Sequence, residues 1–287
     1  MTISPSPSAR QLARYKERPH HPPVVLFYEY SCKSTSAAAG LAQRLAKLAR
    51  THDGQLRWTG AQQQVLIGRV DAYQYCCCLH FLSRGAALEH VEDPQHAELL
   101  RGVKSLQVAV ISEQPRVSRL VIGLMGRLLP WVPFNNAAED TPEPGMGTTV
   151  MPTENAMEAF IGHREQQTPI VMINWLRFRK EARYADPQAP RISGKAAYYL
   201  YGKVAFKVLH SLGAKALFIS RYQQILIGNG GDPGTDLWDE FALVQYPGRA
   251  TFKRMASLKR YRAALHHRQA GLAEHGQGLV VAVSRRL

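Results

Sequence analysis

The segment WDEFALVQYPGRATFKRMASLKRYRAALHHRQAGL, residues 238–272, decides the fold. It reads as an apolar strand, a tight turn at residues 246–249 and a long basic helix. An earlier segment, YQYCCCLHFLSRGAALEHVEDPQHAELL at residues 73–100, has the same order, with Arg84 where the later segment has Arg249. The chain therefore contains one unit of strand, turn and helix twice.

A shorter motif aligns the two copies. QQQVLIG at residues 62–68 and YQQILIG at residues 222–228 agree at five of seven positions. Strand and helix patterns around these motifs give the order βαββαβ over residues 24–112 and again over residues 169–287. A repeat of this size is a duplicated domain, because each copy is long enough to bury a helix face on a sheet.

Each βαββαβ unit predicts an antiparallel sheet with both helices on one face, which is the ferredoxin-like motif. The strands are apolar on both faces, so the face without helices must also be buried. We expect an α+β fold in which the two sheets pack on each other as a pseudo-dimer within one chain. Residues 1–23 lack periodicity and are rich in Ser, Pro, Arg and His, which predicts a disordered lead-in.

The connection at residues 113–168 contains RVSRLVIGLMGRLLPWVPF, residues 116–134, whose arginines and apolar residues fall on opposite sides of a helix. Such a helix packs on the sheets or between two chains, and the second arrangement would make a homodimer. The alternative is contact with a membrane surface, which three arginines and Trp131 would suit.

Composition limits the class of protein. The four cysteines include three consecutive ones and no C-x-x-C pair, which predicts reduced, buried thiols. Neither a membrane-spanning run nor a secretory signal is present, so a cytoplasmic location is expected. The net charge of +14 predicts attraction to an anion, unless it is only a solvated basic face. Nucleic acid is not expected as a partner, because no RNP-type aromatic pattern occurs.

Four separated motifs of the second copy resemble the DUF1330 family of the dimeric α/β-barrel superfamily. They are IVMINWLRFR, AYYLYGK, LWDEFALVQYPGRATFKRM and KRYRAALHHRQAGL, within residues 169–284. The first copy resembles the family weakly, since it lacks the Asn-Trp pair and has Asp71-Ala72-Tyr73 where the second has Leu237-Trp238-Asp239. The resemblance implies the barrel architecture and a functional second unit. The superfamily includes cofactor-free monooxygenases, haem-binding and haem-degrading enzymes, lactone isomerases and polyketide cyclases.

The candidate catalytic residues are polar groups in or beside the second unit's sheet and helices. Asn174 lies within an apolar strand and could bind a carbonyl or phenol, or it is a satisfied buried amide. Asp239 is a candidate general base beside Trp238, or it begins a strand and pairs with Arg249 or Arg177. His267 is a candidate proton shuttle, or it stabilises the end of its helix.

The expected function is that of a small-molecule enzyme with acid-base or cofactor-free oxygenase chemistry on a partly apolar, anionic substrate. Its pocket is expected to be lined by Asn174, Tyr201, Trp238 and His267. Neither a metal nor another cofactor is predicted, because no metal-ligand spacing occurs. The alternative function is non-catalytic binding of a small ligand or haem. Further candidate substrate-binding residues are Arg177, Arg249, Tyr261 and Arg268.

Overall fold

A computed structural model of the chain describes residues 4–19, 22–67, 73–113, 120, 123–124, 128, 150–228 and 238–285, with the backbone alone for 274–285. The strands are β1 (Val24–Ser31), β2 (Gly54–Ile67), β3 (Tyr75–Phe81), β4 (Ser105–Ser112), β5 (Ile170–Phe178), β6 (Lys215–Ile227), β7 (Glu240–Tyr246) and β8 (Leu272–Arg285). The helices are α1 (Ala9–Lys16), α2 (Thr35–Arg50), α3 (Arg84–Glu92), α4 (Pro94–Leu100), α6 (Glu154–Ile161), α7 (Gly194–Ser211), α8 (Arg249–Ser257) and α9 (Lys259–Gly271). A serine or threonine hydroxyl caps the N-termini of α2, α3, α6 and α7.

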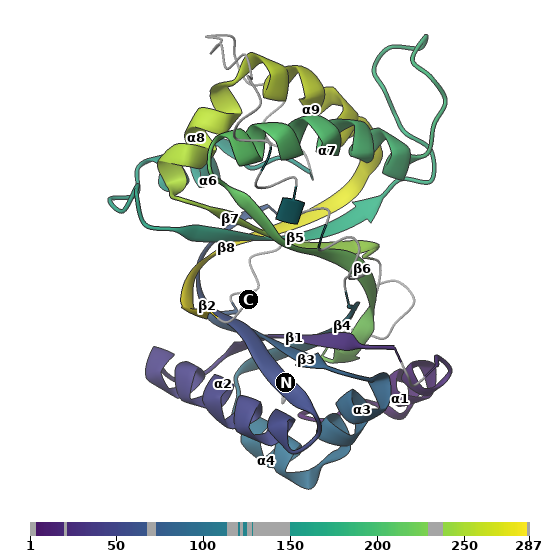
Figure 1. Ribbon diagram of the computed structural model, residues 1–287, viewed down its shortest axis with the longest axis vertical. Helices are drawn as coiled ribbons and strands as arrows, with labels where there is room; N and C mark the ends of the chain where they lie inside the picture. Colours follow the sequence, from purple (N-terminus) through teal and green to yellow (C-terminus); the bar gives the residue numbers. More distant parts are fainter. Residues whose placement is uncertain are drawn as a thin grey trace.

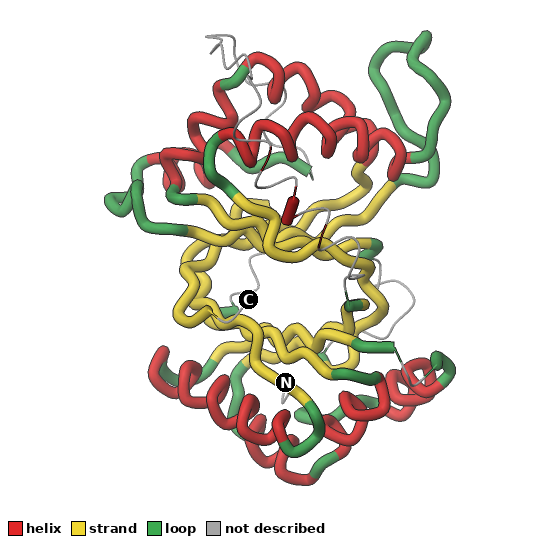
Figure 2. The backbone as a smooth tube through the Cα atoms, viewed as in Figure 1, coloured by secondary structure: helices red, strands yellow, loops and turns green. Residues whose placement is uncertain are grey.

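The described strands close into one barrel in the order β1-β3-β2-β8-β5-β7-β6-β4. Each half contributes four neighbouring antiparallel strands, β4-β1-β3-β2 and β8-β5-β7-β6. The halves meet at two seams, where β2 pairs with β8 and β4 pairs with β6. Figures 1 and 2 show the strands in the middle, with helices on the two opposite outer sides. The predicted fold class is confirmed, and the two sheets also share their edges.

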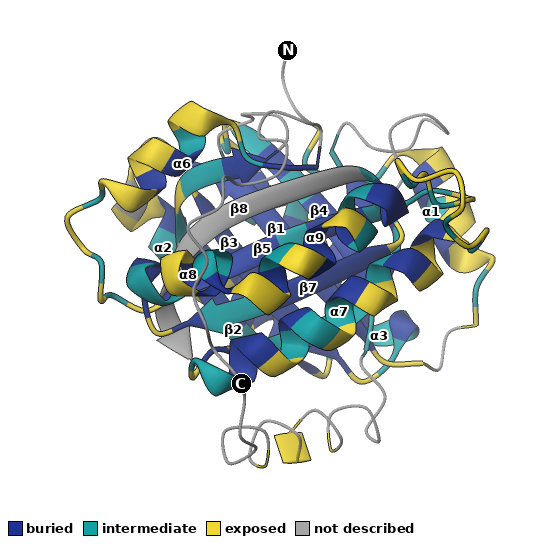
Figure 3. Ribbon diagram, turned by 90° about the horizontal axis from the view of Figure 1, so that it is seen from above, coloured by how far each residue is buried: buried dark blue, intermediate teal, exposed yellow. Residues whose placement is uncertain are grey.

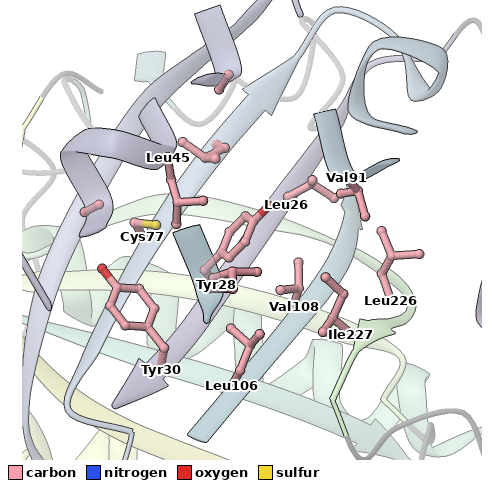
Figure 4. Packing of buried hydrophobic residues seen from close by; sticks show 14 of the residues in the cluster. Leu26, Tyr28, Tyr30, Leu45, Cys77, Val91, Leu106, Val108, Leu226 and Ile227 are labelled. Atoms are coloured by element: carbon pink, nitrogen blue, oxygen red, sulfur yellow. The ribbon is translucent and has the colours of Figure 1, made fainter. Parts of the chain in front are cut away.

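Buried side chains form three regions. The barrel interior is lined by Val25, Phe27, Trp58, Cys76, Cys78, Ala109, Ile111, Val171, Ile173, Trp175, Tyr222, Ile225, Phe241 and Leu243. The first layer lies between the first unit's sheet and α2, α3 and α4, and Figure 4 shows part of it. The second layer lies between the second unit's sheet and α7, α8 and α9, which carry their exposed residues on the outside in Figure 3.

The motif that aligns the two copies forms the seams. Leu226 and Ile227 of the second unit are buried in the first layer, beside residues of the first unit (Figure 4). Reciprocally, Leu66 and Ile67 of the first unit are buried in the second layer. Each unit completes the core of the other, which explains why the two copies agree at these positions.

Two buried arginines cross the seams in the same reciprocal way. Arg84 Nη1 donates to the side chain of Gln223, and Arg249 Nη2 donates to Gln63 Oε1 at 2.6 Å. Burying a guanidinium group requires hydrogen-bond acceptors, and the repeated glutamines supply them. The contact is made twice with equivalent partners, so a role in the fold accounts for the position of Arg249.

The prediction of a disordered lead-in is wrong for residues 9–16, which form α1. Ser8 and Gln11 cap this helix reciprocally, which is a capping box that the sequence contains. Gln224 Nε2 on β6 donates to Gln11 O at 3.1 Å, and Gln64 Nε2 on β2 donates to Ala156 O in α6 at 2.7 Å. α1 and α6 are therefore equivalent helices, each packed against a strand of the opposite unit.

Each long helix predicted after the repeated turn is broken into two. α3 and α4 are separated by Asp93, whose backbone is extended because it precedes Pro94. α8 and α9 are separated at the buried Leu258, which is also extended, and nothing in the local sequence explains this break. The sequence pattern predicts a helix over residues 250–274, but α9 ends at Gly271 and β8 begins at Leu272.

Most of the predicted amphipathic helix at residues 116–134 lies outside the described residues. The described positions Leu120, Leu124 and Leu128 are helical and 73%, 55% and 56% exposed. These leucines, which belong to the predicted apolar side, are therefore not covered by the sheets. The described helices include none with the length and apolar character needed to cross a membrane.

Candidate functional site

The second layer contains ionisable groups where an apolar core would suffice. Glu240 is the first residue of β7, and the two-residue period of the strand points its side chain toward the helices with Ala242. Its carboxylate is buried and accepts a hydrogen bond from Tyr199 Oη at 2.6 Å. Lys195 Nζ lies 2.7 Å from the same oxygen, Oε1. Tyr199 and Lys195 come from the first two turns of α7 and are about half exposed, so Glu240 lies behind a polar edge that faces solvent.

Deeper in the layer, four tyrosines lie close together around one arginine. Tyr201 Oη and Tyr261 Oη are 3.0 Å apart, joining α7 to α9. Burial raises the pKa values of Tyr198, Tyr246 and Tyr261, and the neighbouring Tyr201 raises them further. The charge of Arg268 lowers the same three pKa values. The raised pKa values keep Tyr198, Tyr246 and Tyr261 protonated at neutral pH, and Arg268 places a cation beside them.

Arg268 is 6% exposed and comes from the last turns of α9. Its Nη1 lies 2.7 Å from Met151 Sδ, a weak acceptor contributed by the segment that precedes α6. A buried guanidinium group attracts carboxylates and phosphates, because its charge is little screened there. The second layer thus combines a buried anion-attracting group with a buried carboxylate at its edge.

Asn174 lies on β5 and belongs to the second layer, as predicted for a pocket residue. It is half-buried, and its Nδ2 donates to Met172 O at 3.2 Å and to Ala242 O at 3.4 Å. The side-chain NH2 group of Asn174 therefore has acceptors within the protein, as in the alternative of a satisfied buried amide. Ala242 pairs with Asn174 on the neighbouring strand. The sheet surface between Asn174 and Glu240 therefore carries only a small side chain.

Asp239 is exposed and holds strands together at their ends. Its Oδ2 accepts from Phe178 N at 2.7 Å, its own N–H donates to Leu176 O at 2.8 Å, and its carbonyl accepts from Tyr222 N at 3.0 Å. It lies directly before the first residue of β7, Glu240, and its hydrogen bonds join the ends of neighbouring strands. Arg177 lies half-buried on β5 opposite residue 274 of β8.

The residues predicted to line one pocket are separated in the structure. Trp238 packs against the barrel interior, with its ring centroid 6.3 Å from that of Trp175. His267 Nδ1 lies 2.8 Å from Tyr184 Oη, which belongs to the segment between β5 and α7. Burial and the adjacent His266 lower the pKa of His267. Of the four predicted lining residues, Asn174 and Tyr201 share the second layer, whereas Trp238 and His267 do not.

Sequence reasoning missed several groups of the second layer. Glu240, Lys195 and Tyr246 were not singled out, although Glu240 opens an otherwise apolar strand of EFALVQY. The same reasoning that selected Asn174 in β5 would have selected Glu240 in β7. Tyr246 was hidden because its position in the repeated turn suggested a purely structural role.

A haem does not fit the described residues of the second layer. The histidine proposed as its ligand, His267, pairs with Tyr184 instead of facing the buried tyrosines. Within the described part of the chain, His, Cys, Asp and Glu side chains form no group of three that could hold a metal ion.

The barrel of two ferredoxin-like units is the dimeric α/β-barrel fold, built here within one chain. No family model matches the sequence, and no curated protein matches it. Among solved structures, a protein of unknown function from Rhodopseudomonas palustris is 29% identical, over 47% of this chain and 97% of that one, with a TM-score of 0.42. An anthrone oxidase-like protein is 12% identical over 94% of both chains, with a TM-score of 0.46. A chlorite dismutase from Candidatus Nitrospira defluvii, in complex with imidazole, is 10% identical over 90% of both chains, with a TM-score of 0.44.

Proposed function

We propose that the chain is a small-molecule enzyme of the dimeric α/β-barrel type, with its site in the second layer, and that the second unit is a DUF1330-type unit. The observation that carries this proposal is the burial of Glu240 and Arg268 in one layer with four tyrosines. Buried ionisable groups gathered beside phenols are typical of sites where chemistry takes place. The packing of helices on a sheet does not require them.

The arrangement supports acid-base chemistry on an anionic, partly apolar substrate. Arg268 would attract the anionic group, and the phenols of Tyr201 and Tyr261 would donate hydrogen bonds to it. Glu240 would accept a proton from the substrate, and the Oη of Tyr199, 2.6 Å from the carboxylate, would connect it to solvent. Asn174, on the floor of the layer, would orient a carbonyl or phenol.

The positive net charge of the chain supports the choice of an anionic substrate, because it raises the local concentration of anions around the protein. Aromatic carboxylates combine the two features that the layer would recognise, a flat apolar ring and a negative group. Deprotonation of such a substrate is also the first step that cofactor-free oxygenases, isomerases and cyclases share.

The test is binding of salicylate, and proton exchange of benzoylacetate, an aromatic carboxylate whose C–H between its two carbonyl groups is acidic, measured above the rate in buffer alone. Calorimetry should show binding to the wild type, weaker binding to Tyr261→Phe, and wild-type binding to Tyr30→Phe. Tyr30 is the matched control, because it is a buried phenol of the first layer that donates to Ala38 O at 2.8 Å.

Glu240→Gln separates an enzyme from a binding protein. In an enzyme it should retain most of the ligand affinity but lose deuterium exchange at the acidic position of the substrate, measured by NMR. Exchange at the wild-type rate in Glu240→Gln would exclude Glu240 as the base. Binding without exchange in the wild type would favour the alternative of a non-catalytic small-ligand protein.

A further inference from the structure

The barrel interior contains a carboxyl group that the proposed function does not use. Glu29 lies on β1, faces inward with Val25 and Phe27, and is only 7% exposed. Gln107 Nε2 donates to Glu29 Oε2 at 3.3 Å, and the Trp175 indole also forms a hydrogen bond with this carboxyl. The remaining described lining is mainly aliphatic and aromatic, so this acid lies in an apolar environment.

A second polar group in the same region lacks a partner. The Trp58 side chain on β2 is fully buried in the barrel interior, and its Nε1 has no hydrogen-bond acceptor among the residues that the structure describes. An unsatisfied buried donor costs about 1–3 kcal/mol, which makes it rare in folded proteins. A bound molecule with an acceptor oxygen would satisfy it.

Glu29 and Trp58 face the same interior from strands that flank β3. β3 lies between their strands, and Glu29 pairs with Cys76 while Trp58 pairs with Cys78. Two strand spacings and a shift of two residues put their backbones roughly 12 Å apart. Both side chains face the barrel interior.

The thiols between them are structural. Cys76 Sγ donates to Gly60 O at 3.4 Å, and burial raises the pKa values of Cys76 and Cys78 well above the usual range. They are therefore protonated at neutral pH and are not nucleophiles. The polar chemistry of this region rests on Glu29 and Trp58.

The fold itself does not require these two residues. In the duplicated unit, β5 begins its pairing at Ile170 as β1 does at Val24, so the position of Glu29 is occupied by Trp175. The repeated motif places Phe218 where the first unit has Trp58. The equivalent of Trp58 is Phe218, which has no N–H, so the fold alone does not explain the unpaired indole.

We propose that the barrel interior is a second ligand site, for a flat, neutral molecule whose carbonyl oxygen accepts from Trp58 and which lies against the Glu29 carboxyl. This site is separate from the second layer and does not depend on the function proposed there. The partly exposed Leu217, Phe218 and Trp238 pack against the interior and mark where it approaches solvent. Binding requires a neutral ligand, because a carboxylate would face Glu29 in an apolar environment.

The test uses 2-acetylnaphthalene as the carbonyl probe and 2-ethylnaphthalene as the probe of similar shape without an acceptor. Quenching of tryptophan emission reports binding, because Trp58, Trp175 and Trp238 all lie at the site. The wild type should bind the ketone more tightly than the hydrocarbon. Trp58→Phe should weaken ketone binding about tenfold and leave hydrocarbon binding unchanged, since one hydrogen bond is lost.

Two further variants keep the proposal testable if Trp58→Phe is poorly folded. In the wild type, ionisation of Glu29 should weaken ketone binding between pH 6 and pH 8. Glu29→Gln should abolish this pH dependence. Tyr261→Phe, in the second layer, should bind the ketone as the wild type does. Equal affinity for the two probes in the wild type, or loss of ketone binding in Tyr261→Phe, would overturn the assignment.

Discussion

Replacement of His90 by leucine is expected to make the protein more resistant to acid. His90 lies in the first layer of helices with no exposed surface, and neither ring nitrogen has a hydrogen-bond partner among the described residues. Burial lowers its pKa to about 3, and positive charge on His96 or His52 would lower it further, whereas Asp93 opposes this effect. The imidazole therefore stays neutral in the folded protein at pH values where the unfolded chain is protonated.

The sign and size of the effect follow from this difference. The unfolded histidine takes up a proton below pH 6.5, whereas the folded one does so only near pH 3, so stability falls as the pH drops through this interval. At pH 7 the cost is about 0.2 kcal/mol, and at pH 5 it is about 2 kcal/mol. His90→Leu removes this cost, and its advantage over the wild type should grow by about 2 kcal/mol between the two pH values.

Urea unfolding followed by circular dichroism at pH 7, 6 and 5 measures this difference. The comparison between pH values is informative because packing changes caused by leucine contribute equally at each pH. His266→Leu is the matched control, since His266 is an exposed histidine on α9 and undergoes the same substitution. Parallel pH profiles for the wild type and His90→Leu would show that His90 is protonated in the folded state and would refute the reasoning.

Three other sets of substitutions test the barrel interior, the seam and the helix packing. Burial raises the pKa of Glu29 to about 7, so its ionisation costs stability above pH 4.5, and Glu29→Gln should stabilise the chain by about 3 kcal/mol at pH 7 but only about 1 kcal/mol at pH 5 in urea unfolding. A double-mutant cycle of Arg249→Met and Gln63→Leu should give a coupling energy of about 1–2 kcal/mol, and zero coupling would contradict the hydrogen bond across the seam. Gly194→Ala should destabilise by about 1–3 kcal/mol, because its Cβ would clash with the backbone oxygens of Arg179 and Gly271. Gly202→Ala in the same helix meets nothing within 4 Å and should gain about 0.5–1 kcal/mol in thermal unfolding.

The fold could be predicted because the same order of strands and helices occurs twice in the sequence. Strand and helix periodicities were read in both copies, and the motifs at residues 62–68 and 222–228 aligned them. The sequence does not reveal that Leu66 of the first unit packs in the second layer, or that Leu226 of the second unit packs in the first layer. That exchange depends on which strand edges meet, and periodicity within one strand contains no information about its neighbour.

The site was predicted less well for a related reason. Asn174 and Tyr201 lie in the layer between sheet and helices, and both stand out locally as an amide in an apolar strand and a tyrosine on a helix face, whereas their roles stay predictions. Trp238 was placed with them from adjacency to Asp239, but strand alternation and the barrel put it against the interior. His267 lies on the same helix as Tyr261, and only the path of the segment carrying Tyr184 decides what it contacts.

The contact between Glu29 and Trp175 explains what a fused chain can do that a dimer of one unit cannot. The two residues occupy equivalent positions of the duplicated units and meet in the barrel interior through a hydrogen bond. In a symmetric homodimer every residue near the axis faces its own copy, so two carboxyls or two indoles would meet. Two buried carboxyls would repel each other when ionised, and two indoles would offer donors without an acceptor. Fusion of the units allowed one copy to supply the acid and the other its donor, while the seams kept the reciprocal arginine and glutamine pairs that both copies need.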